Sequence, residues 1–154
     1  MENKVTFRNA ERKDTGLILQ FVKELAAYED MSDDVIADES ILETWIFDKQ
    51  KAEVLFAVVD GTEVGFALFF HNFSTFLGRA GLYLEDLFVM PEYRGKGYGK
   101  ALLKKLASIA VERGCGRSAS RTMLCFTTRI HPVASGTKPR YAARTAKALT
   151  ATAP

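Results

Sequence analysis

The chain has 154 residues, of which 47% are hydrophobic and 26% charged, the size and composition of a single globular domain. These values exclude disordered, collagen-like and disulfide-scaffold proteins. No apolar run approaches the roughly 18 residues of a membrane span, and residues 1–6 lack the pattern of a signal peptide, so we expect a cytoplasmic protein without a membrane partner. Cys115 and Cys125 are too few for a metal site, and we expect none.

Charge is distributed unevenly along the chain. Residues 1–112 contain 13 Lys and Arg against 19 Asp and Glu, whereas residues 113–154 contain 8 against none. Average composition gives an acidic residue at about every eighth position. The last quarter of the chain therefore differs in kind from the rest.

Apolar spacing predicts one strand and two helices in the first third of the chain. Alternation over residues 5–8 is typical of a short strand. Asp14 is placed to cap a helix over residues 17–28, whose apolar side chains recur at three- and four-residue steps. Asp38 is placed to cap a second, shorter helix that ends near Phe47.

The middle of the chain predicts three strands. Residues 54–59 and 64–70 are strand-forming runs that flank Asp60-Gly61, a strong hairpin signal. Residues 82–90 form a further apolar run, which we expect to be a buried strand that Pro91 ends.

A helix is predicted after this strand. Apolar residues recur at helical spacing over 98–110, and Gly114 and Gly116 suit the end of a helix. Periodicity then fades: residues 123–128 are a weak strand candidate and residues 142–149 a weak helix candidate.

The glycine loop, residues 94–100, carries the clearest chemical signal. Its sequence, Arg-Gly-Lys-Gly-Tyr-Gly-Lys, places three glycines at alternate positions directly before a helix. Glycine lets the backbone approach a ligand closely, and the first N–H groups of a helix have no intrahelical acceptor. The helix dipole and the cations of Arg94, Lys96 and Lys100 add positive charge, so the loop predicts a phosphate site.

The glycine loop does not match two widespread phosphate-binding motifs. A Walker loop requires Ser or Thr where Ala101 stands, and the dinucleotide fingerprint requires Gly or Ala where Leu102 stands. A plain turn needs only one or two glycines, and a basic nucleic-acid patch does not need three of them, so both fit the loop less well than a phosphate site.

The loop, following a strand that ends Val-Met-Pro, resembles the acetyl-CoA loop of the GNAT superfamily of N-acetyltransferases. The resemblance is closer to the spermidine/spermine and thialysine N-acetyltransferases and covers about residues 3–117. Three further segments carry it: Glu-Leu-Ala-Ala-Tyr-Glu at 24–29, Ser-Thr-Phe-Leu-Gly-Arg at 74–79, and the run 82–94.

This resemblance implies an α/β (α+β) fold, a mixed and mostly antiparallel sheet with helices on both faces. It implies a GNAT domain over residues 1–117, acetyl-CoA as co-substrate, and a homodimer that binds no nucleic acid. The cofactor would be bound by loop amides and by the backbone of the preceding strand. The implied cofactor-binding residues are Leu87, Phe88, Val89, Arg94, Gly95, Lys96, Gly97, Tyr98, Gly99 and Lys100.

Glu85 is the implied catalytic residue, a carboxylate that helps to remove a proton from the substrate amine. Asp86 is its neighbour on the strand, so we expect the two side chains to point to opposite faces and not to act as a pair. Glu85 could instead pair with a structural Arg. For Asp86 a substrate-binding and a structural role are equally open.

Tyr28 and Glu29 belong to the substrate side in the resembling enzymes, where Glu29 could bind the second amine of a diamine. Alternatively, Tyr28 ends the apolar face of its helix and Glu29 is solvated. The implied reaction transfers acetyl from acetyl-CoA to a primary amine of a diamine, polyamine or lysine-like amino acid. The alternatives are a CoA-binding protein without catalysis and, less favoured, a nucleic-acid-binding module. His71 and His131 have no partner pattern.

The resemblance ends near Arg117. The family's Asp-Trp-Asn strand and the later Tyr that protonates CoA thiolate are missing, and Tyr141 lies about eight residues too late to take that role. Our hypothesis is that residues 118–154 are an atypical basic tail that arose from a shifted reading frame or a chimeric end. The rival, a basic extension for an RNA partner, is less favoured because its cations are sparse.

Overall fold

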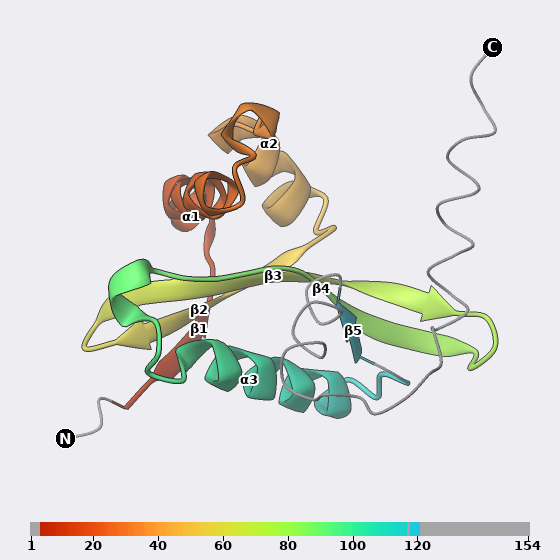
Figure 1. Ribbon diagram of the computed structural model, residues 1–154. Coiled ribbons are helices and arrows are strands. Elements are labelled where there is room, and N and C mark those ends of the chain that lie inside the picture. The colour runs from red at the N-terminus through yellow and green to blue at the C-terminus, as the bar shows by residue number, and fades with distance from the viewer. Residues whose placement is uncertain (1–3, 117, 121–154) are drawn as a thin grey trace, which may run out of the picture.

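The computed structural model describes residues 4–116 and 118–120. Five strands form one sheet in the order β1-β2-β3-β4-β5 (Figure 1). The strands are β1 (Thr6–Asn9), β2 (Glu53–Val59), β3 (Thr62–Ser74), β4 (Arg79–Val89) and β5 (Ser118–Ser120). The first four pair antiparallel, and β5 pairs parallel to β4. The expected mixed, mostly antiparallel sheet is confirmed.

Helices cover both faces of the sheet, as expected (Figure 1). The first face carries α1 (Thr15–Tyr28), α2 (Glu39–Glu43) and a π-helical turn at Thr44–Asp48, and the second carries α3 (Tyr98–Glu112). Short 3-10 turns lie at Arg12–Asp14, Ser32–Asp34 and Pro91–Tyr93. Among the described helices, none is long and apolar enough to cross a membrane.

Each face of the sheet has its own apolar core. Under α1, the rings of Phe21 and Phe66 stack with centroids 5.5 Å apart, and Phe56 and Phe88 pack around them. Under α3, the buried side chains are aliphatic for the most part, with Leu102 at the centre. Burial of each such side chain contributes about 1.5–3 kcal/mol. Together the two cores fix the ends of α1, β4 and α3 relative to one another.

The hairpins match the predicted positions but extend further. Asp60 and Gly61 both have positive φ, +50° and +79°, as the expected two-residue turn requires. Strand β3 continues beyond the predicted end at residue 70 to Ser74, which pairs with Arg79. The extension is exposed on both sides, so it carries no apolar alternation from which it could have been predicted.

Asp14 precedes α1 as predicted, but its side chain does not cap that helix. Its carboxylate accepts a hydrogen bond from the Glu11 N–H at 2.7 Å and two from the Arg8 guanidinium at 2.7 and 2.9 Å. The 3-10 turn at Arg12–Asp14 directs the carboxylate back toward β1. Asp38, by contrast, caps α2 as predicted, because its Oδ1 accepts from the Ile41 N–H at 2.8 Å.

Several expectations concern residues outside those described. They are the strand at 123–128, the helix at 142–149, and the roles considered for Cys125, His131 and Tyr141. Within residues 4–116 and 118–120, no cluster of His, Cys, Asp and Glu could hold a metal ion.

Candidate active site

A cavity of about 390 Å³ opens where the end of α1, the end of β4 and the start of α3 meet. Most of the residues expected to bind cofactor line it, together with two expected on the substrate side. The lining residues are Leu25, Tyr28, Glu29, Leu87, Phe88, Val89, Tyr93, Arg94, Gly95, Gly97, Tyr98 and Gly99. Lys96, Lys100, Glu85 and Asp86 are not among them.

The three glycines of the loop serve two different purposes. Gly95 and Gly97 have φ of +78° and +84°, and a Cβ at either position would meet nothing within 4 Å. These two are therefore required by backbone conformation. Gly99 lies in α3, where a Cβ would be 3.6 Å from the Leu87 side chain, an ordinary contact that brings the helix close to β4.

The loop presents a row of backbone N–H groups without acceptors. The first intrahelical bond of α3 runs from the Ala101 N–H to the Gly97 carbonyl at 3.0 Å, so the N–H groups of residues 98–100 precede it. Within the described part of the chain, the N–H groups of residues 95–97 donate to no backbone carbonyl either. Together with the helix dipole, these donors form an anion site.

The edge of β4 near its end is open toward the cavity. The Met90 N–H donates to the Val64 carbonyl in β3, and strand alternation then turns the backbone groups of Leu87 and Val89 away from β3. Among the described residues, only β5 pairs with that edge, and it reaches β4 no further than Leu84. The N–H and C=O groups after that point can therefore pair with an extended ligand.

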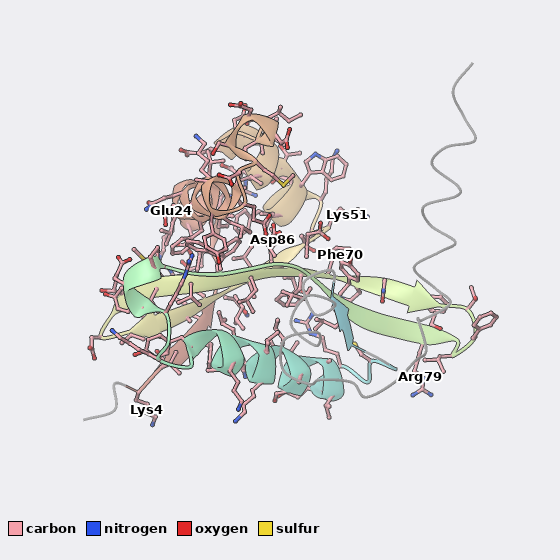
Figure 2. All side chains as sticks on the ribbon, viewed as in Figure 1. Lys4, Glu24, Lys51, Phe70, Arg79 and Asp86 are labelled. Carbon is pink, nitrogen blue, oxygen red and sulfur yellow. The ribbon has the colours of Figure 1, made fainter. Side chains whose placement is uncertain are left out.

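A β-bulge changes the expected arrangement of the two carboxylates. Leu84 and Asp86 pair with adjacent residues of β3, so Glu85 is an extra residue in β4. Leu84 and Leu87 both belong to the core under α3, so Glu85 and Asp86 between them lie on the opposite face, toward α1. Figure 2 shows the Asp86 side chain on that face. The expectation of opposite faces is wrong because it assumed unbroken alternation.

Residues 19–129 match the model of the acetyltransferase (GNAT) family. The chain belongs to the GNAT acetyltransferase family. Thialysine N-epsilon-acetyltransferase of Bos taurus is 39% identical over 122 residues, 73% of this chain and 71% of that protein. Spermidine/spermine N(1)-acetyltransferase-like protein 1 of Homo sapiens is 34% identical over 116 residues, 70% of this chain and 16% of that protein.

Solved structures of GNAT enzymes share the fold. An aminoglycoside acetyltransferase from an uncultured soil metagenomic sample has a TM-score of 0.70 at 18% identity, with 91% of this chain and 95% of that chain covered. Ribosomal-protein-alanine N-acetyltransferase from Brucella melitensis has a TM-score of 0.67 at 22% identity, with 88% and 97% covered. The chain is therefore an N-acetyltransferase that uses acetyl-CoA and acts on amines.

Arg94 is less available to a ligand of this acetyltransferase than the sequence suggests. Its Nε–H donates to the Val89 carbonyl at 2.8 Å, and its guanidinium lies 4.3 Å from the centre of the Tyr28 ring. Lys96 lies over the Tyr93 ring at 5.1 Å. The loop cations thus pack against aromatic rings around the cavity.

Sequence reasoning missed two lining residues and the bulge. Leu25 lies one helical turn before Tyr28 and Glu29, so the (i, i+3) and (i, i+4) spacings identify it as part of the same helix face. Tyr93 directly precedes the loop. The bulge is visible as the three-residue step from Leu84 to Leu87 in a strand of two-residue steps.

Proposed function

We propose that the cavity binds acetyl-CoA with its diphosphate on the amides of residues 95–100 and its pantetheine arm along the open edge of β4 at Leu87–Val89. The supporting observation is that the acceptor-free amides and the open edge belong to one cavity. Lys96 and Lys100 add positive charge near the diphosphate without lining the cavity.

In the proposed reaction, the acceptor amine attacks the thioester carbonyl carbon directly. An alkylammonium group, with a pKa near about 10.4, must first lose a proton. Glu85 takes that proton, directly or through a water molecule. The backbone N–H groups near Leu87 and Val89 polarise the carbonyl, the C–S bond breaks, and the CoA thiolate leaves and is protonated.

We assign the acceptor to small molecules with a primary amine, such as a diamine, a polyamine or a lysine-like amino acid. Glu29 on the cavity wall supplies a carboxylate for a second ammonium group, and Asp86 lies on the same face of the sheet as Glu85. Residues 29–43 contain seven Asp and Glu and no Lys or Arg, which favours a dicationic acceptor over an anionic one.

The test combines titration calorimetry of acetyl-CoA with a CoA-thiol release assay over a panel of amines. Glu85→Gln should lower kcat by about 10²–10⁴-fold while the acetyl-CoA Kd stays within about twofold of wild type. Glu92→Gln, a change at an exposed residue of the Pro91–Tyr93 turn, is the matched control. Acetyl-CoA binding without thiol release from any amine would favour the CoA-binding protein without catalysis.

We further propose that the enzyme is a cytoplasmic homodimer, which the family resemblance supports. Light scattering of the purified protein should then give twice the chain mass of 17.1 kDa. A monomer mass at micromolar concentration would contradict this.

A further inference from the structure

Arg94 joins three elements at the entrance of the cavity. Its Nε–H donates to the carbonyl of Val89, the last residue of β4, at 2.8 Å. Its guanidinium lies 4.3 Å from the centre of the Tyr28 ring at the end of α1 and 5.3 Å from that of Phe88. Arg94 is also the first residue of the glycine loop, so its side chain anchors the point at which the loop leaves the sheet.

The core does not hold Tyr28 in place. It is 66% exposed, although it is the last residue of a helix whose inner face is buried. Its ring covers one side of the Arg94 guanidinium, and a planar guanidinium stacks well on an aromatic face. The stack keeps the guanidinium oriented so that Nε–H reaches the Val89 carbonyl.

We infer that Tyr28 is a positioning residue for the cofactor loop and acts on it through Arg94. The inference rests on the proposed function of that loop, the binding of the acetyl-CoA diphosphate. Without the Tyr28 ring, Arg94 loses orientation, the Val89 carbonyl loses its donor, and the N–H groups after Gly95 are no longer fixed toward the cavity. Tyr28 thus affects the cofactor although it lies on the substrate side.

The test measures the acetyl-CoA Kd by calorimetry in the absence of any acceptor amine. Tyr28→Leu should weaken binding by about 2- to 30-fold, the range expected for loss of a cation–π contact. Tyr28→Phe keeps the ring and should stay within about twofold of wild type. Arg94→Lys keeps the positive charge but loses the planar stack and the Nε–H donor, so it should weaken binding as well.

A double-mutant cycle separates positioning from an independent effect. If Tyr28 acts through Arg94, Tyr28→Leu should cause little further loss in the Arg94→Lys background. Full additivity would overturn the inference, as would unchanged acetyl-CoA affinity in Tyr28→Leu while the wild type binds. If the wild type itself does not bind acetyl-CoA, the proposed function fails instead.

Discussion

Arg8 shows how single residues fix the base of the site. Its guanidinium binds both oxygens of Asp14 and one oxygen of Glu63 at 2.8 Å, and lies 4.8 Å from the centre of the Phe56 ring. The Arg8 hydrogen bonds lower the pKa of Asp14 from its usual value. This cluster joins β1, the start of α1 and β3, and so helps to set where α1 ends at the cavity.

Replacement of Asp14 by Asn should lower the free energy of unfolding at pH 7 by about 1–2 kcal/mol, since Arg8 is partly exposed and keeps Glu63. Because folding lowers the pKa of Asp14, its contribution is complete above the unfolded pKa of about 3.9 and is lost as pH falls through the folded value. Urea unfolding from pH 7 to pH 3 measures this. The difference between the two proteins should shrink below about pH 4.

The exposed Asp33, in the Ser32–Asp34 turn, is the matched control for that experiment. Asp33→Asn should leave the free energy of unfolding within about 0.5 kcal/mol of wild type. Equal stability of Asp14→Asn and wild type at pH 7 would show that the Arg8 cluster does not stabilise the fold.

At the scale of elements, the glycine loop and α3 form one structural unit. Gly97 is the N-cap of α3 and has a positive φ, whereas Gly99 has helical geometry one turn before Leu102. The two glycines look alike in the sequence, but only the first requires a conformation that other residues adopt at a cost.

Substitution of these glycines by Ala should therefore have opposite effects. Gly97→Ala should lower the free energy of unfolding by about 1–2 kcal/mol, because Ala resists the left-handed region. Gly99→Ala should leave it unchanged or raise it by up to about 1 kcal/mol, because Ala is the better helix former. Urea midpoints at pH 7 test both, and a Gly97→Ala protein as stable as wild type would contradict the conformational argument.

At the scale of the whole molecule, charge is separated around the cavity. The acidic segment 29–43 begins at its substrate side, and the glycine loop with its cations lies opposite. This separation favours an anionic cofactor on one side and a cationic acceptor on the other.

We expect the acceptor preference to depend on salt. Raising ionic strength from about 0.05 M to about 0.5 M shortens the Debye length severalfold. The kcat/KM for a diamine or polyamine should then fall more than that for a monoamine of equal chain length. Initial rates of thiol release at saturating acetyl-CoA measure the comparison. Parallel salt curves for both amines would show that the acidic segment does not contribute to acceptor binding.

The basic tail proposed for residues 118–154 is tested on the protein from native cells. Peptide mass spectrometry should find peptides up to Arg117, and peptides of a different sequence after it, if a shifted frame or chimeric end produced this tail. Recovery of Arg121–Pro154 peptides from native cells would contradict that hypothesis.

How far the sequence predicted the structure depended on how local each feature is. The Asp38 cap, the Asp60-Gly61 turn and the helix after the glycine loop follow from contacts within a few residues. Asp14 was misassigned as a cap because its partner, Arg8, lies on a different element. The Arg94 side chain likewise bonds to a strand end and stacks on a helix end that spacing does not bring together.

By itself, the sequence determined the elements, the loop chemistry and the family, because periodicity and turn preferences are local and the loop residues are contiguous. Tertiary structure decided which side each group serves. The bulge at Glu85 moved it to the face of Asp86, and packing of α1 placed Tyr28 on Arg94. Pairing register and helix docking depend on the whole core, which no short segment specifies.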